Sequence, residues 1–95
     1  MPKGYWIARV DVSDPEAYKN YVANTPAAID KFGGRFLARG GRAQALEGPM
    51  RSRNVIIEFD SFEQAVACYD SPEYQNARRH RVGAAEAEFM VVEGI

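Results

Sequence analysis

Hydrophobic and polar residues alternate along several short stretches of this chain. The stretches are residues 5–12, 35–39, 53–60 and 86–93. In the first of them Trp6, Ala8 and Val10 share one side, and the residues between them lie on the other. A period of two is typical of a strand with one face on a core, so the pattern predicts four strands. We expect residues 43–47 to continue the second strand or to pair with it.

A helix is expected to begin after the first strand and to run to about residue 32. Asp14 is a favoured N-cap residue, and a proline follows it at the first helical position. Pro26 interrupts the pattern, so we expect a kink there, or a new start capped by Asn24 or Thr25. The pair Gly33-Gly34 ends the helix as a left-handed C-cap does.

Two shorter helices are expected between the third and fourth strands. Residues 60–64 contain overlapping capping boxes, and Ser71-Pro72-Glu73 repeats the start signal of the first helix. The resulting order is βαββαβ, the split βαβ arrangement of a ferredoxin-like sandwich. We therefore expect residues 1–95 to form one α+β domain, in which the helices cover one face of a four-stranded antiparallel sheet.

The uncovered, or open, face of that sheet mixes apolar and polar side chains. The apolar ones are Ile7, Leu37, Ile56, Met90 and Val92, and the polar ones are Tyr5, Arg9, Arg35, Arg39 and Glu58. A sheet face this apolar exceeds the patch that a monomer normally exposes. We therefore expect a homodimer in which two open faces meet isologously.

Composition favours a core of aromatic rings packed on a sheet. The chain has 14 alanines and 11 aromatic residues but only two leucines, which suits a sheet better than a helix bundle. The net charge of −1 argues against a nucleic-acid binder, so we expect no nucleic-acid partner. Five arginines and one glutamate fall within residues 35–53, and anion or nucleic-acid binding by this basic stretch is a third hypothesis.

The sequence also excludes several kinds of site and location. Cys68 is the single cysteine, so neither an intrachain disulfide nor a cysteine-based metal site can form, and we expect no metal. No apolar run approaches the ~20 residues of a membrane span. The first strand begins too early to leave room for a signal peptide, so we expect a cytoplasmic protein without a membrane partner.

Three functions found on ferredoxin-like sandwiches do not fit. The third strand, residues 53–59, lacks the glycine and stacking aromatics of an RNA-recognition domain. No cysteine pair follows the first strand, as a copper chaperone requires. The acidic loop at residues 11–14 would repel the phosphate that an acylphosphatase binds.

Five segments carry a resemblance to a known family. They are Tyr5-Trp6-Ile7-Ala8-Arg9-Val10, Asp14-Pro15-Glu16-Ala17-Tyr18, Gly33-Gly34-Arg35-Phe36-Leu37-Ala38-Arg39-Gly40-Gly41, Val55-Ile56-Ile57-Glu58-Phe59 and Ser71-Pro72-Glu73-Tyr74. Together they resemble the domain of unknown function 1330 family over nearly the whole chain. The resemblance implies a dimeric α+β barrel, in which two ferredoxin-like sheets face each other. It implies no agreed reaction or catalytic residue, and we expect no cofactor.

The wider barrel superfamily supplies only an analogy of fold. It includes small monooxygenases, haem-degrading enzymes, muconolactone isomerases and chlorite dismutases. These activities differ from one another, and a shared fold does not choose among them.

Arg9, Arg39 and Glu58 are the charged residues that we expect on the apolar, dimer-facing side of the sheet. An unpaired charge is costly in such a place. Two interpretations follow. The charges form an ion-pair network that holds the dimer together, or the arginines clamp an anion while Glu58 orients one of them or acts as a catalytic base.

The segment 72–82 and two tyrosines supply the other candidates. His80 is either a solvated surface residue or a single acid–base group that borders a cleft. Arg81 lies on the inward side of the segment, where it can reach a pocket. Tyr69 joins the expected ligand-binding residues because its hydroxyl can reach the rim of the core, and Tyr5 because it shares the open face with the arginines.

Two functions fit these features. The first is a small homodimer that binds a small organic molecule, anionic or aromatic, in a cleft between the sheet and the helix at 72–82. Such a protein would turn the molecule over as a cofactor-independent oxygenase or isomerase. The second is a non-catalytic dimeric binding or interaction module with structural charges. Alanine at Arg39 or Glu58 separates them, since it abolishes ligand binding in the first case and the dimer in the second.

Overall fold

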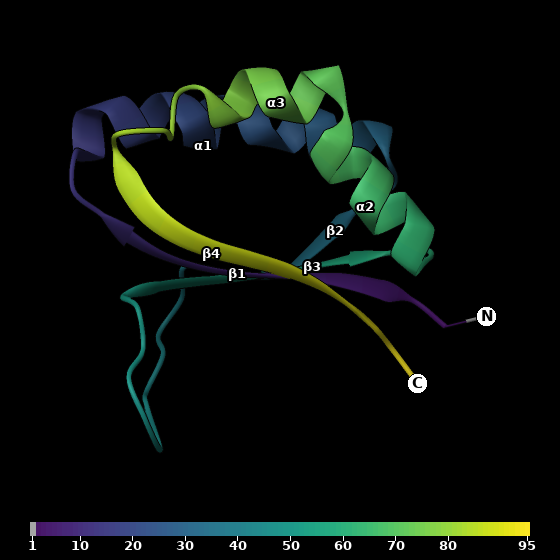
Figure 1. Ribbon diagram of the computed structural model, residues 1–95, viewed down its shortest axis with the longest axis horizontal. Coiled ribbons are helices and arrows are strands. Elements are labelled where there is room, and N and C mark those ends of the chain that lie inside the picture. Colours follow the sequence, from purple (N-terminus) through teal and green to yellow (C-terminus); the bar gives the residue numbers. More distant parts are fainter. Residues whose placement is uncertain (1) are drawn as a thin grey trace.

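The computed structural model describes residues 2–95 as a sheet with three helices on one side (Figure 1). The elements in chain order are β1 (Gly4–Val12), α1 (Pro15–Lys31), β2 (Arg35–Arg39), β3 (Arg53–Phe59), α2 (Phe62–Asp70), α3 (Pro72–Arg78) and β4 (Ala85–Glu93). The strands are antiparallel in the order β2-β3-β1-β4. This is the ferredoxin-like arrangement, so the predicted fold class is confirmed. None of the helices in the described range is long and apolar enough to cross a membrane.

A cluster of aromatic rings fills the space between the sheet and the helices, with Trp6 at its centre. Four other rings pack on Trp6 with centroids 4.9 to 6.0 Å away: those of Phe59, Tyr69, Tyr74 and Phe89. The indole N–H donates to the carbonyl oxygen of Ala65 on α2, at 2.7 Å, so the polar atom of the ring is satisfied. The alternation predicted for the first strand is confirmed, because the side of β1 that carries Trp6 is buried.

Helix α1 begins and ends near the predicted residues but does not restart at Pro26. Asp14 caps its first turn, and Gly33 beyond its end takes a left-handed φ of 72°. The restart is wrong, because one continuous helix spans Pro15–Lys31. Thr25 does not cap a new helix; its hydroxyl donates to a carbonyl oxygen one turn back, at 2.6 Å. Pro26 instead leaves one carbonyl of the previous turn without its usual N–H donor.

Strand β2 carries an extra residue that changes which side chains face the helices. Phe36 pairs with Ile57, but Ala38 rather than Leu37 pairs with the next residue of β3. Leu37 is therefore the additional residue of a β-bulge, and the alternation restarts after it. Arg39 consequently lies on the helix side with Phe36, next to α1. The expectation that Arg39 lies on the open face is wrong.

The segment between β2 and β3 does not form the predicted strand extension. Residues 43–47 neither continue β2 nor pair with it. Every residue from 40 to 50 is exposed. Figure 1 shows this loop, in teal, extending away from the sheet on the side opposite the helices.

Candidate functional site

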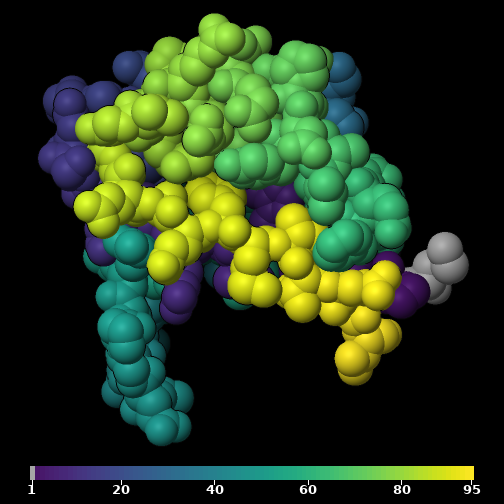
Figure 2. Space-filling model, in the orientation of Figure 1, coloured from purple at the N-terminus to yellow at the C-terminus, as the bar shows by residue number. Residues whose placement is uncertain are grey.

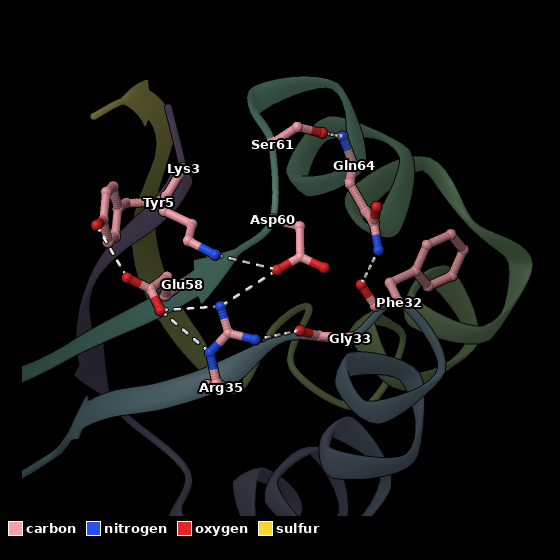
Figure 3. A network of polar contacts seen from close by, with 9 residues as sticks. All are labelled: Lys3, Tyr5, Phe32, Gly33, Arg35, Glu58, Asp60, Ser61 and Gln64. Carbon is pink, nitrogen blue, oxygen red and sulfur yellow. Dashed lines mark hydrogen bonds and ion pairs between the residues drawn. The ribbon is translucent and has the colours of Figure 1, made fainter. Parts of the chain in front are cut away.

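The open face carries two groups of ion pairs, and the first surrounds Glu58 (Figure 3). Arg35 donates two hydrogen bonds to Glu58 Oε1, at 2.9 and 3.1 Å, and the Tyr5 hydroxyl donates one to Oε2, at 2.9 Å. Arg35 also reaches Asp60, at 3.4 Å, and Lys3 lies at the same distance from that carboxylate. Both oxygens of Glu58 are thus occupied.

These contacts decide how Glu58 titrates. The guanidinium of Arg35, and then the Tyr5 hydroxyl, hold the pKa of Glu58 below its ordinary value. The pKa of Tyr5 is raised in turn, because its hydroxyl donates to the Glu58 carboxylate. A carboxylate with a lowered pKa and two occupied oxygens is a weak base. The geometry therefore favours the ion-pair interpretation of Glu58.

The second group of ion pairs lies at the other end of the open face. Arg9 pairs with Glu88 at 3.3 Å, directly across the β1–β4 register. Arg51, from the loop before β3, contacts Asp11 at 2.9 Å and Glu88 at 3.3 Å. Arg9 and Arg51, like Arg35 in the first group, are therefore neutralised by carboxylates of the same face.

The three charged residues expected to share the open face do not form one site. Arg9 and Glu58 belong to different ion-pair groups. Arg39 lies on the opposite side of the sheet, against α1. An anion clamp made by Arg9, Arg39 and Glu58 together is thus ruled out by their placement.

A small space, the inner cavity, lies between the sheet and α1 and is lined by all four strands and that helix. Its volume is about 30 Å³, which is room for about two water molecules. The rings in its lining are those of Trp6, Tyr18, Tyr21, Phe36 and Phe89. The charged residues in its lining are Arg39 and Arg53. The inner cavity is therefore aromatic and apolar, with positive charge at its edge.

Three guanidinium groups lie over the rings of the inner cavity. The distances from guanidinium carbon to ring centroid are 4.4 Å for Arg39 on Phe36, 5.7 Å for Arg53 on Tyr18 and 4.6 Å for Arg81 on Phe89. Arg81 comes from the turn after α3, on the inward side of the segment as predicted. Stacking on a ring stabilises a guanidinium but does not neutralise it.

These three arginines differ from those of the open face in having no carboxylate partner within the described chain. They differ in burial: Arg39 is exposed, Arg53 is half-buried and Arg81 is only 7% exposed. The Nε atoms of Arg53 and Arg81 are buried without a hydrogen-bond partner among residues 2–95. Burial of an unpaired charge costs free energy. The helix side of the sheet thus holds positive charge that a bound anion would compensate.

Arg81 also lies beside a pair of buried hydroxyls. The hydroxyl oxygens of Tyr21 and Tyr74 are 2.8 Å apart and share a hydrogen bond that links α1 to α3. Burial raises the pKa of both phenols, and the positive charge of Arg81 opposes the shift. Both phenols are therefore protonated near neutral pH. One hydroxyl donates to the other, and the second keeps a proton that it can donate to a ligand oxygen.

A larger space, the outer hollow, opens between α2 and the edge strand β4. Its lining residues are Trp6, Val66, Tyr69, Asp70, Phe89, Met90 and Val91, and its volume is about 260 Å³. Figure 2 shows it as an opening between the green of α2 and the yellow of β4, through which the purple of β1 is visible. Trp6 and Phe89 line both spaces, so they form the wall between the inner cavity and the outer hollow.

The remaining candidates lie outside both spaces. His80 is exposed in the turn after α3, beside a separate surface pocket that includes Glu73. Cys68 is buried, which raises the pKa of its thiol to about 12, so the thiol is protonated and serves packing. Within residues 2–95 no three histidine, cysteine or carboxylate side chains are grouped so that they could hold a metal ion.

The predicted ligand-binding residues divide between the two sides of the sheet. Arg39 lines the inner cavity, Tyr69 lines the outer hollow, and Arg81 lies over the ring of Phe89, which lines both. Arg9 and Tyr5 lie on the open face. Sequence reasoning missed Arg53. The signal was present, because Arg53 stands two residues before Val55 and so shares its side of the strand.

Comparisons with known proteins place the chain in a fold group. The family model described as "Domain of unknown function (DUF1330)" matches residues 3–95. Among curated proteins none matches the chain. A protein of unknown function from Rhodopseudomonas palustris is 20% identical with a TM-score of 0.77, over 99% of this chain and 83% of that one.

Two further solved structures have similar folds at lower identity. SnoaB, described as a cofactor-independent oxygenase from Streptomyces nogalater, is 13% identical with a TM-score of 0.66, over 97% of this chain and 92% of that one. An ethyl tert-butyl ether d (ethd) family protein from Bacillus halodurans is 12% identical with a TM-score of 0.61, over the whole of both chains. At these identities the likeness is one of fold.

Proposed function

This chain belongs to the DUF1330 family, whose description names no activity, and from that premise we propose a function centred on the inner cavity. The protein binds a small organic anion that carries an aromatic or conjugated ring, between the sheet and α1. The observation that carries the proposal is the set of three arginines, each stacked on a ring of the cavity and none paired with a carboxylate in the described chain.

Both parts of such a ligand have matching partners at the inner cavity. A guanidinium binds a carboxylate or phenolate oxygen with directed N–H bonds, and buried guanidinium groups gain most from the counter-charge. When the Tyr74 hydroxyl donates to Tyr21, the Tyr21 hydroxyl keeps its own proton and adds a neutral donor at the same place. The aromatic lining accepts a flat ring by stacking. A neutral aliphatic molecule would leave Arg53 and Arg81 unpaired, so the ligand class is anionic and ring-bearing.

A ring needs more room than the inner cavity contains. Ligand sites are usually about 300–1,000 Å³, whereas the inner cavity is about 30 Å³ and the outer hollow about 260 Å³. Phe89 stands in the wall between them and is only half-buried. Rotation of the Phe89 ring would join the two spaces. The ligand therefore enters through the outer hollow and displaces this ring.

The turnover that we propose is cofactor-independent oxygenation or isomerisation of the bound anion. Fixed positive charge stabilises an enolate or phenolate, which is the electron-rich form that reacts with O2. For a phenolic substrate, the ring carbon para to the hydroxyl gains one oxygen atom as a carbonyl. The hydrogens of that C–H and of the O–H leave as water with the second oxygen atom. The likeness of fold to SnoaB, described as a cofactor-independent oxygenase, supports this class of reaction.

The alternative is a binding or interaction module that performs no reaction. One observation favours it: the acid–base groups expected from the sequence lie away from the inner cavity. Glu58 is held in an ion pair on the open face, and His80 is exposed beyond α3. In this form the ligand is bound and released unchanged, and the open-face charges are purely structural.

We also propose a homodimer formed through the open face. Met90 and Val92 are 55% and 40% exposed there, beside Ile7 and Ile56 in the β1 register. Contact with the same strip of a second copy would remove this apolar surface from water. The ion-pair groups at the two ends of the face would then form a polar rim.

A cytoplasmic location completes the proposal. Cys68 is a buried free thiol, so the described fold does not depend on oxidising conditions. Fractionation of the native cells with an antibody to this protein tests the location.

The proposed binding is tested with salicylate, a ring-bearing anion, and with salicylamide as a neutral control of nearly the same shape. A ligand of the folded state raises the midpoint of thermal unfolding, and we expect this with salicylate alone. Incorporation of label from isotopically labelled O2 into a bound phenol separates turnover from simple binding. Equal shifts with both compounds, or no shift with either, contradict the proposal.

A further inference from the structure

The arm, residues 41–50 of the loop between β2 and β3, leaves the body of the protein. Figure 1 shows it on the side of the open face, and each of its residues is exposed. Leu46 is 87% exposed, and a methyl group added at Gly41 or Gly48 would meet no other atom within 4 Å. As far as the described residues go, nothing packs against the tip of the arm.

The root of the arm is nevertheless fixed at both ends. Gly40 has a left-handed φ of 68°, and its backbone packs directly against the Arg53 guanidinium. At the other end the Ser52 amide donates to Asp11 Oδ1 and Arg51 Nη1 donates to Asp11 Oδ2, both at 2.9 Å. The direction in which the arm leaves the sheet is therefore set by β1 and β3.

An arm of this kind needs contacts from another molecule. Holding residues in one conformation costs conformational entropy, which a folded segment normally recovers by burying apolar surface. Leu46 buries almost none in its own chain. A partner that covers Leu46 would supply the missing contribution.

A second copy of this chain fits the arm and the open face together. Figure 2 shows a notch below the sheet, with the teal arm on one side and the yellow C-terminal residues on the other. The sheet face above this notch has its arginines paired with its own carboxylates. Such a face meets an identical face without repulsion between like charges. It offers no strong field to a nucleic acid or another polyion, so the occupant is a second copy.

The arm is longer than the gap that two stacked sheets leave. Sheets that pack face to face lie about 10 Å apart, whereas a leg of about five extended residues reaches up to about 17 Å. An arm on one copy therefore passes beyond the sheet of the other. We propose that residues 41–50 are a clasp, which buries Leu46 against the body of a second copy and holds the two open faces together. The clasp rests on the homodimer proposed above.

Sedimentation equilibrium of Leu46→Asp tests the clasp, with Val82→Asp as the matched control. Val82 is also an exposed apolar residue, at 59%, but it lies in the turn after α3. Because each copy loses one buried leucine, we expect Leu46→Asp to raise the dissociation constant of the dimer at least about tenfold. Val82→Asp should change it less than about threefold. Equal effects of the two substitutions overturn the clasp.

The rate of trypsin cleavage after Arg42, measured over a range of protein concentrations, tests the clasp in the unaltered protein. In the clasp Arg42 lies in the interface, so its cleavage slows as the protein concentration passes through the dissociation constant of the dimer. Cleavage after Arg79, exposed beyond α3, serves as the internal control and stays constant. A monomer at all concentrations overturns both the dimer and the clasp. A stable dimer that is cut after Arg42 at one rate throughout overturns the clasp alone.

Discussion

Arg39 Nη2 donates a hydrogen bond to the carbonyl oxygen of Val22, with the two atoms 3.4 Å apart. In an uninterrupted helix this carbonyl accepts from the amide four residues later, but Pro26 has no N–H. Arg39 takes the place of that donor from β2, and it lies at the same time over Phe36 at the edge of the inner cavity. The Val22 carbonyl that Pro26 leaves without a helical donor therefore helps to fix the position of Arg39 at the cavity edge.

Replacing Pro26 with alanine should stabilise the protein and uncouple Arg39 from Val22. An interior proline costs about 3 kcal/mol relative to alanine, and the greater freedom of the unfolded variant takes back about 1 kcal/mol. We therefore expect the free energy of unfolding to rise by about 2 kcal/mol. Urea denaturation of Pro26→Ala, Arg39→Met and the double variant measures both effects. Arg39→Met should lower the free energy of unfolding by less when residue 26 is alanine than when it is proline. An equal loss in both cases would show that the bond from Arg39 to Val22 contributes nothing to stability.

The bulge at Leu37 explains why the position of Arg39 could not be predicted from the sequence. Strict alternation along residues 35–39 places Arg39 with Arg35 on the open face, and the bulge reverses the sides after Leu37. Nothing in these five residues marks a bulge, because it is fixed by pairing with β3. Arg53 is the opposite case, since counting back from Val55 places it on the helix side without any structure.

Deletion of Leu37 should be tolerated. The deletion removes the additional residue and leaves Phe36 and Arg39 on the helix side, now in a regular ladder. Leu37 is 58% exposed, so little buried surface is lost. We expect the free energy of unfolding to change by less than about 1 kcal/mol. Deletion of Ile56 from the facing strand is the control and should unfold the protein. If deletion of Leu37 also unfolds the protein, the bulge is needed for folding.

Replacing Arg81 with methionine should stabilise the ligand-free protein. Apolar replacement of a buried ion pair can stabilise by about 1–4 kcal/mol, and Arg81 is buried without a carboxylate partner among the described residues. The lost contacts with Phe89 and Tyr21 take back roughly 0.5–2 kcal/mol. A net gain of about 1 kcal/mol corresponds to a rise of about 4–8 °C in the thermal midpoint of a domain of this size. Calorimetry with Arg79→Met as the exposed control measures it. A lower midpoint in Arg81→Met would make Arg81 a structural residue.

Lowering the pH should destabilise the folded protein by protonating Glu58 on the open face. The folded pKa of Glu58 is held below its ordinary value, first by Arg35 and then by Tyr5, so the unfolded chain binds this proton at higher pH than the folded protein. The stabilising contribution is complete above the ordinary glutamate pKa of about 4.3 and is lost as the pH falls through the lower folded value.

The acid effect is measured as thermal midpoints between about pH 7 and about pH 3. Glu58→Gln should start from a lower midpoint and fall less steeply below about pH 4 than the unaltered protein. Glu63→Gln, exposed in the first turn of α2 and away from the open face, should keep the original profile. If the midpoint falls equally steeply with pH in all three proteins, the contact with Arg35 does not lower the pKa of Glu58 on folding.

Local patterns were sufficient for the fold but not for the ion pairs. The caps at Asp14 and Gly33 and the buried side of β1 depend on neighbours in sequence, and they lie where the sequence predicted them. The pairing of Arg35 with Glu58 depends on the register between β2 and β3, and that of Arg51 with Asp11 on where an exposed loop returns to the sheet. Sequence reasoning therefore recognised these charges without finding their partners.

In the proposed function, arginines at the inner cavity bind an anion, whereas arginines on the open face are neutralised by carboxylates. Titration calorimetry of salicylate with the unaltered protein, Arg53→Met and Arg9→Met compares the two kinds of arginine. We expect Arg53→Met to weaken salicylate binding at least about tenfold and Arg9→Met to leave it unchanged. Full affinity in Arg53→Met, or an equal loss in Arg9→Met, would contradict the proposed function.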